Sequence, residues 1–319
     1  MSRLSSSAGV GLHFDSFRES MGLMGLRDRT FHQPDPFFLK TAPRLLEIAE
    51  DYGIKLTIFV IGRDLEDPAV ADQVRAWQQQ GHEIANHSYS HDHNLGDRSQ
   101  ESITREVVEA EILIEKTTGT KPKGFAAPAW SLSRRLIRVL IKRGYSYDAS
   151  LFPSWIKIPM MLKLKLRSPQ KSRFPILKRS DLSANFLGHS EPHRLGDTSL
   201  WRSDPNGIWE IPVPTNGFSA IPCYHTMAFF LGKRLFQSLL RRCSGRQDFL
   251  YYVIHPLDIL DPDKDLRDVD GIPLSLLERA TVPIQKKVDL MRTAFESISS
   301  ERRVLPLKDA VRLFEGGKT

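Results

Sequence analysis

The sequence predicts an α/β fold built around a mostly parallel sheet, and two observations carry this prediction. Short runs rich in β-branched and aromatic residues alternate along the chain with segments of helical spacing, which is the pattern of strands and helices taken in turn. Seven or eight such units in a chain of 319 residues match a β/α barrel. Polar residues follow several of the expected strands, and such a barrel collects its reactive groups at the C-terminal ends of its strands.

The first half of the chain contains five expected strands with helices between them. The strands are short apolar runs at residues 10–14, 55–61, 83–86, 124–127 and 145–148. The run at 55–61, KLTIFVI, is dense in β-branched and aromatic residues, which favours a buried strand. The intervening helices are expected at residues 43–51, 70–80, 102–116 and 133–143. Pro43 suits the first turn of its helix, and Gly144 stands where the last of these helices ends.

The second half repeats the pattern after an interruption. Residues 156–207 read as an insertion, and strands are expected at 208–213 and 249–254. Residues 274–297 have mainly helical spacing, and 304–307 and 309–314 add a last strand and helix. We therefore expect residues 1–319 to form a single domain, with 156–207 inserted into it.

Composition and charge exclude several classes of protein. With 40% apolar and 26% charged residues, the chain is expected to be globular rather than disordered. No stretch approaches the roughly 18 apolar residues of a membrane-spanning helix, and the first residues lack the apolar segment of a secretory signal. Its two cysteines, Cys223 and Cys243, supply neither a disulfide framework nor a cysteine-based zinc cluster. A cytoplasmic location is the expectation.

The net charge of +7 is concentrated in one segment. Residues 156–179 contain eight basic residues and no acidic one, so the rest of the chain carries −1. No basic face with aromatics or recognised motif accompanies this charge, and we expect no nucleic-acid partner. The run LKLKLR at 162–167 alternates apolar and basic residues as a strand would, which suits peripheral contact with an anionic membrane or a lipid phosphate. A solvated hairpin that shields the barrel edge is the alternative.

Two histidines after the third expected strand form a candidate metal site. In GHEIANHSYSH, residues 81–91, His87 and His91 are four residues apart and can converge on one divalent ion as neutral imidazoles. The spacing alone also fits a structural or surface role, and His93 fits a solvated loop. A zinc hydrolase usually adds a carboxylate ligand and keeps a position open for water.

Five strings occur in an order that resembles a known family. They are TIFVIG (57–62), GHEIANHSYSH (81–91), GFAAPAWS with GYSYDASLFPS (124–131 and 144–154), WEIPVPT (209–215) and YYVIHPLD (251–258). Together they resemble the NodB-homology polysaccharide deacetylases, the carbohydrate esterases of family 4.

The resemblance implies a distorted (β/α)7-type barrel and a hydrolase that removes an N-acyl group, acetyl or formyl, from a carbohydrate. The glycan would be polymeric or lipid-linked. It also implies one divalent metal held by an Asp-His-His triad, with Zn²⁺ as the expected ion and Co²⁺, Ni²⁺ or Mn²⁺ as alternatives. The two histidines of this triad correspond to His87 and His91.

The aspartate of the triad has two placements, because the family's usual Thr-Phe-Asp-Asp-Gly is replaced here by LHFDSF. In one, Asp15 is the general base and Ser16 stands in the metal position. In the other, Asp15 is the metal ligand and His13 takes the base position. Residues two apart on a strand face the same way, so His13 and Asp15 would share the barrel mouth, which favours the second placement. The alternative for His13 is a packed strand residue without a catalytic role.

Three further positions follow from the resemblance. Ala126 stands where relatives carry an arginine that orients the base carboxylate; its absence fits an imidazole base and equally fits a loss of activity. Pro128 and Trp130 would line the substrate groove, with a core position as the alternative for Trp130. His255 would donate a proton to the leaving amine. Two other functions remain open: a catalytically silent sugar-binding relative, and a metal-dependent hydrolase of a small non-sugar amide.

Overall fold

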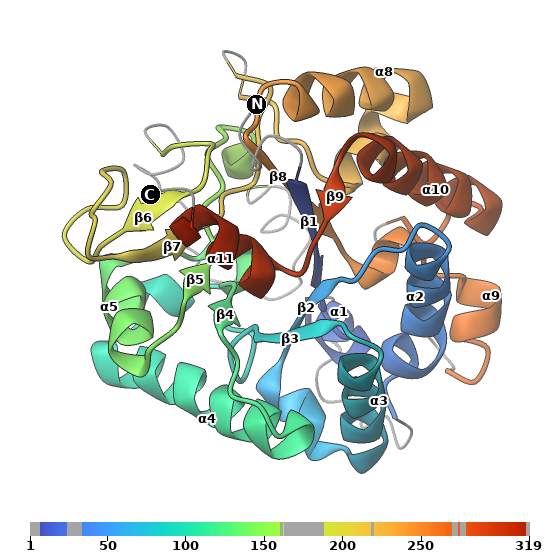
Figure 1. The fold of residues 1–319 in the computed structure, drawn as a ribbon. Coiled ribbons are helices and arrows are strands. Elements are labelled where there is room, and N and C mark those ends of the chain that lie inside the picture. The colour runs from blue at the N-terminus through green and yellow to red at the C-terminus, as the bar shows by residue number, and fades with distance from the viewer. Residues whose placement is uncertain are drawn as a thin grey trace.

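The computed structural model describes residues 7–23, 34–159, 162, 188–217, 220–269, 274 and 279–316. Its centre is a curled sheet whose strands follow the order β6-β7-β5-β4-β3-β2-β1-β8, with β9 also paired to β1 (Figure 1). The strands are β1 (Ser7–His13), β2 (Thr57–Val60), β3 (Glu83–Asn86), β4 (Gly124–Phe125), β5 (Tyr147–Asp148), β6 (His193–Leu195), β7 (Ile208–Glu210), β8 (Phe249–Ile254) and β9 (Arg303–Val304). The α/β fold and the distorted barrel expected from the sequence are confirmed.

The sheet is parallel except at one edge. β1 pairs in parallel with β2, β8 and β9, whereas β6 runs antiparallel to β7. β6 lies within the expected insertion, so part of residues 156–207 extends the sheet rather than standing apart from it. Parallel pairing brings the C-terminal ends of β1, β3 and β8 to the same end of the barrel, and the candidate residues lie at this end.

Helices cover the outside of the curled sheet (Figure 1). The α-helices are α1 (Phe17–Leu23), α2 (Ala42–Glu50), α3 (Pro68–Gln79), α4 (Gln100–Thr118), α5 (Arg134–Arg143), α8 (Thr226–Ser244), α9 (Pro262–Asp265), α10 (Ile284–Glu301) and α11 (Leu307–Gly316). Short helical segments of other types are η1 (Phe37–Thr41), η2 (Gly62–Glu66), η3 (Leu95–Asp97), η4 (Pro128–Trp130) and η6 (Pro256–Asp258). Within the described residues, no helix is both long and apolar enough to cross a membrane.

The ends of α5 show why the local sequence forms this helix. The Ser133 hydroxyl accepts a hydrogen bond from the backbone N–H of Leu136 at 3.1 Å and so caps the first turn. At the other end Gly144 adopts φ 75°, the left-handed conformation that only glycine adopts without strain. Between them Leu136, Ile137 and Leu140 are buried against the outer face of the sheet.

The interior of the barrel depends on two glycines that leave room for tyrosine rings. A Cβ on Gly11 would lie 2.5 Å from Tyr251 Oη, and one on Gly124 would lie 1.9 Å from Tyr147 Cζ. The Tyr147 hydroxyl donates to Glu83 Oε1 at 2.9 Å, and burial raises the pKa of that glutamate. The two glycines therefore admit large polar side chains to the interior.

The start of α11 closes the opposite end of the sheet from the candidate residues. The backbone N–H of Leu307 donates to Thr57 Oγ1 at 2.8 Å, and that of Lys308 donates to Glu83 Oε2 at 2.9 Å. These two side chains satisfy donors that a helix N-terminus leaves unpaired. The carboxylate also lies at the positive end of the helix dipole.

Two parts of the sequence analysis differ from the structure, and a third lies almost entirely outside the described residues. The helix expected at 274–297 begins at Ile284, because Pro283 lacks an N–H and its ring cannot occupy a helix interior. Helix α8 was not predicted; Gly232, at φ 73° and ψ 164°, interrupts its helical pattern. The strand predicted at 162–167 lies outside the described residues apart from Leu162, which is helical.

Candidate active site

Asp15, His87 and His91 lie together at the C-terminal ends of β1 and β3. One ligand atom from each residue lies within 4.8 Å of the others, and they form the only such group of metal-ligating side chains among the described residues. The Asp15 carboxylate Oδ1 is 3.0 Å from His91 Nε2 and 3.5 Å from His87 Nε2. The structure thus brings together the three residues that the second placement assigned to the metal.

Ser16, the alternative residue for the metal position, points elsewhere. Its hydroxyl accepts the backbone N–H of Glu19 at 3.4 Å and so belongs to the start of α1. Its side chain is fully buried. The geometry therefore favours Asp15 over Ser16 as the oxygen donor.

A tight loop turns the two imidazoles back toward β1. Ser88 and His91 adopt φ values of 65° and 58°, a left-handed conformation that costs about 1–3 kcal/mol per residue when a side chain is present. The Asn86 side-chain oxygen accepts the Ser88 N–H at 2.8 Å, and the Ser88 hydroxyl accepts the His91 N–H at 3.1 Å. Glu106 of α4 accepts the N–H groups of Tyr89 and Ser90. These contacts offset the strain and hold the histidines in register.

The protonation states suit cation binding. His87 Nδ1 lies 2.7 Å from the Ala126 carbonyl oxygen, which can only accept, so Nδ1 carries the proton and Nε2 keeps its lone pair. Burial lowers the pKa of His87, even though its hydrogen bond with Asp15 acts in the opposite direction. Burial alone would raise the pKa of Asp15, but His91 and His87 hold it well below its ordinary value. An ionised Asp15 carboxylate therefore faces the unprotonated Nε2 of His87.

The donor set fits a divalent cation. Within the described residues both ring nitrogens of His91 are buried and neither makes a well-formed hydrogen bond, although Nε2 lies 3.0 Å from Asp15 Oδ1 and Nδ1 lies 3.5 Å from Glu19 Oε2. A buried nitrogen without a partner is costly, and a cation between Asp15 Oδ1 and the two Nε2 atoms would satisfy the nitrogen that faces Asp15. Two nitrogens and one carboxylate oxygen form the three-ligand set typical of catalytic zinc, which leaves a position open.

His13 lies directly behind this group. Its Nε2 is 3.0 Å from the hydroxyl of Tyr251, and its ring centroid is 5.1 Å from that of His87 and 5.7 Å from that of His255. Burial, reinforced by the neighbouring His87 and His255, holds the pKa of His13 well below its ordinary value. His13 is therefore both packed and adjacent to the candidate ligands, so it combines features of the two alternatives for this residue.

His255 approaches from the end of β8. Its backbone N–H donates to Asp258 Oδ2 at 2.9 Å, and its Nδ1 lies 3.9 Å from the same oxygen. Asp258 is fully buried and pairs with Arg279, whose Nε lies 3.1 Å from Oδ1. The sequence analysis missed Asp258 as a neighbour of His255, although its position three residues later in HPLD was a usable signal.

Pro128 and Trp130 form η4 beside the histidines. Trp130 is only 7% exposed, and its ring lies 4.6 Å from Phe152 and 6.0 Å from His13. The Trp130 carbonyl oxygen accepts a hydrogen bond from the Lys157 ammonium at 2.7 Å. Lys157 is itself buried, so the first basic residue of segment 156–179 anchors η4 instead of facing a membrane. Any contact of Trp130 with substrate would involve only the small exposed part of its ring.

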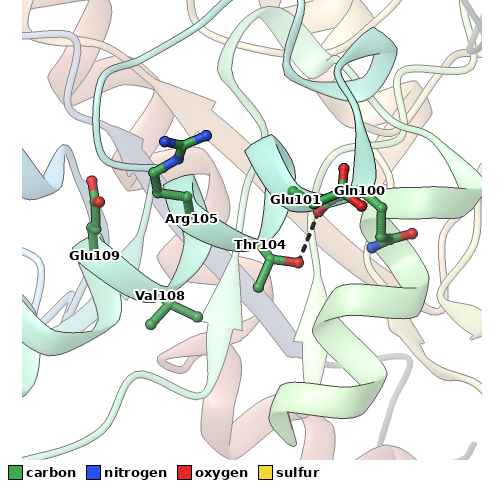
Figure 2. Close-up of a pocket in the computed structure, with 6 residues that line it drawn as sticks. All are labelled: Gln100, Glu101, Thr104, Arg105, Val108 and Glu109. Carbon is green, nitrogen blue, oxygen red and sulfur yellow. Dashed lines mark hydrogen bonds between the residues drawn. The ribbon is translucent and has the colours of Figure 1, made fainter.

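A surface depression on α4 is not part of this site. It is lined by Gln100, Glu101, Thr104, Arg105, Val108 and Glu109, which share one face of a single helix (Figure 2). None of the candidate catalytic or metal-ligating residues contributes to it. The polar side chains in Figure 2 do not converge on a common point, so the depression provides no set of catalytic or ligating groups.

Comparisons with known proteins relate part of this chain to polysaccharide deacetylases. Residues 31–147 match the family model described as polysaccharide deacetylase, a range that includes His87 and His91 but not Asp15 or His255. A peptidoglycan deacetylase of Helicobacter pylori is 31% identical over 137 residues, which are 39% of this chain and 45% of that protein. A peptidoglycan deacetylase-like protein of Gibberella zeae is 34% identical over 112 residues, which are 34% of this chain and 32% of that protein. The chain thus matches less than half the length of these curated relatives.

The fold has a counterpart among solved structures. A crystal structure described as a "putative polysaccharide deacetylase" from Mycobacterium smegmatis aligns with a TM-score of 0.60 over 98% of this chain and 92% of that chain. The two sequences are 18% identical, so the similarity bears on the fold alone.

Proposed function

We propose that this chain is a metal-dependent hydrolase that removes an N-acyl group, acetyl or formyl, from a carbohydrate, and the match of residues 31–147 to the polysaccharide deacetylase model supports this. The observation that carries the proposal is the convergence of Asp15 Oδ1 with the Nε2 atoms of His87 and His91. A divalent cation held there supplies Lewis-acid polarisation of the acyl carbonyl and lowers the pKa of water. Zn²⁺ suits the donor set, with Co²⁺, Ni²⁺ and Mn²⁺ as alternatives.

The other residues have roles that follow from their positions. His13, held at Nε2 by Tyr251, would align the attacking water through its other nitrogen if the tyrosine hydroxyl accepts the Nε2 proton. His255, whose Nδ1 side faces Asp258, would protonate the leaving nitrogen. The Trp130 ring, 6.0 Å from His13 and 6.2 Å from His255, would border the bound sugar.

The substrate class follows from the relatives. Two of them are described as peptidoglycan deacetylase or similar to it, which supports a polymeric glycan carrying N-acetyl groups. A lipid-linked glycan is the alternative substrate. A silent sugar-binding protein and a hydrolase of small non-sugar amides are competing functions, and the experiment below separates them.

The test combines metal content with hydrolysis. Purified protein is analysed for bound ions after reconstitution with Zn²⁺, Co²⁺ or Mn²⁺, and release of acetate or formate from N-acyl glycans is measured. We expect stoichiometric metal in the wild type, and loss of metal and activity in Asp15→Ala and His87→Ala. His93→Asn is the matched control, because His93 lies in the same loop outside the ligand group.

A further variant separates metal binding from proton transfer. His255→Ala should keep its metal and lose about 10²–10⁴-fold in rate, the usual contribution of a general acid. Metal without hydrolysis of any N-acyl sugar would favour the silent relative, and hydrolysis confined to small amides would favour the third function. Metal lost in His87→Ala but retained in Asp15→Ala would return Asp15 to the role of base.

We further propose peripheral contact with an anionic membrane. Most of segment 156–179 lies outside the described residues, so the support comes from α8. Phe230 and Leu235 are 66% and 64% exposed, the highest values among the large apolar side chains described. Between them lie Arg234 and Lys233, the latter paired with Asp289 of α10 at 2.7 Å, and α8 itself contains no acidic residue. Tyr224, two residues before α8, packs 6.0 Å from the Trp130 ring, so a membrane at this helix would lie near the candidate active site.

A further inference from the structure

Glu19 is a buried carboxylate that faces His91 from the side opposite Asp15. It lies in the first turn of α1, which begins two residues after Asp15, so the two carboxylates are close in the chain and both face the histidine loop. Glu19 Oε2 is 3.5 Å from His91 Nδ1, whereas Asp15 Oδ1 is 3.0 Å from His91 Nε2. The imidazole of His91 therefore stands between two carboxylates, one at each ring nitrogen.

The two histidines are supported in the same way by different groups. The Ala126 carbonyl oxygen receives the Nδ1 proton of His87, and Glu19 is placed to receive that of His91. The carbonyl fixes the proton of His87 at Nδ1 and leaves its Nε2 lone pair toward Asp15, and a carboxylate facing Nδ1 favours the same tautomer of His91. The difference is charge, because an anionic acceptor raises the basicity of the opposite nitrogen more than a neutral carbonyl does.

Arg63 holds Glu19 in this position. Its guanidinium pairs with Glu19 Oε1, and an adjacent cation favours the ionised form of a buried carboxylate. Arg63 lies in η2, whose start is bound to the histidine loop: the N–H of Gly62 donates to the Ser88 carbonyl at 2.9 Å, and that of Arg63 to the Tyr89 carbonyl at 3.1 Å. The carboxylate, its counter-ion and the loop thus form one rigid unit.

We propose that Glu19 is a positioning residue for metal binding, which orients the His91 imidazole through Nδ1 and is kept in place by Arg63. The inference rests on the proposed function only in taking His91 as a ligand. Outer carboxylates that support a ligating histidine typically contribute about 10–100-fold to metal affinity. The resemblance that revealed Asp15 and the histidines did not reveal Glu19, because its partners come from residues 63 and 91.

The test measures metal affinity rather than activity. Dissociation constants for Zn²⁺ and Co²⁺ are determined by chelator competition, and the absorption spectrum of the Co²⁺ form is recorded. Glu19→Gln should weaken binding about 10–100-fold and change the Co²⁺ spectrum. Glu66→Gln is the matched control, since Glu66 contacts the same loop through the Tyr89 hydroxyl at 2.7 Å without touching an imidazole; its affinity should stay within about twofold of wild type.

A second variant guards against misfolding, because Glu19→Gln leaves the partly buried Arg63 without this carboxylate. The double variant Glu19→Gln/Arg63→Gln removes both charges, and circular dichroism with urea unfolding verifies its fold. Weak metal binding in a folded double variant supports the proposal. Wild-type affinity in both variants overturns it, even if the protein is an active deacetylase. Weakened binding in a protein that hydrolyses no N-acyl sugar supports the inference and contradicts the proposed function, whereas a wild type without metal overturns both.

Discussion

Gly11→Ala tests whether the space beside β1 is needed for the Tyr251 ring. The added Cβ would lie 2.5 Å from Tyr251 Oη and 2.7 Å from its Cε2, where ordinary contacts begin near 3.4 Å. The tyrosine is 1% exposed and so has no room to swing aside. A displacement of roughly 1 Å would also break its contact with His13 Nε2 at 3.0 Å.

The expected destabilisation follows from these contacts. Overpacking a buried site costs about 1–3 kcal/mol, and the lost hydrogen bond costs about 0.5–1.5 kcal/mol. Replacing glycine by alanine stabilises by about 0.4–1 kcal/mol through the unfolded chain, which offsets part of this loss. We therefore expect the free energy of unfolding to fall by about 0.5–4 kcal/mol.

Urea unfolding followed by circular dichroism measures this difference. Gly245→Ala is the control, because a Cβ there would meet nothing closer than the Arg241 carbonyl oxygen at 3.4 Å and Gly245 has φ −70°. Adding Tyr251→Phe to Gly11→Ala removes the closest contact and should restore part of the loss. If Gly11→Ala unfolds within about 0.5 kcal/mol of wild type, the packing argument is wrong. If His13 is the base, the variant should also keep its metal while its hydrolysis rate falls.

Two further predictions concern the membrane and pH. Binding to vesicles that contain anionic lipid should weaken as salt is added, and it should fall about 10–100-fold in the double variant Phe230→Ser/Leu235→Ser. Ile112→Ser is the control, because Ile112 is 57% exposed on α4, and its binding should not change. Equal binding to neutral vesicles would contradict the charge argument. Burial lowers the pKa of His225 from 6.5 to about 4, so the unfolded chain takes up a proton first as pH falls through 6.5 and stability is lost between pH 6.5 and 4. The loss from this group should reach about 2 kcal/mol at pH 5, and in His225→Gln the unfolding free energy should fall by about that much less between neutral pH and pH 5; an equal fall would refute this assignment.

Local patterns explain which elements could be predicted. β3 was expected at residues 83–86 and is found at Glu83–Asn86, and the α5 helix ends at Gly144 as expected, because strand periodicity and helix caps depend on neighbouring residues alone. Prediction was weaker where one residue breaks a pattern. Gly232 interrupts the helical pattern of α8, so this helix was not predicted, and Pro283 places the start of α10 ten residues later than expected.

In the candidate site, some residues could be found from local sequence patterns and others only from the tertiary structure. Strand alternation, the spacing of His87 and His91 in one short loop, and the family resemblance made His13, Asp15, His87 and His91 candidates from the sequence alone. Their companions came from the tertiary structure: Tyr251 beside His13, and Glu19 and Arg63 behind His91. These contacts join residues far apart in the chain because parallel strands bring their C-terminal ends to one edge of the sheet. Which side chains meet across that edge depends on strand order and register, which no local pattern contains.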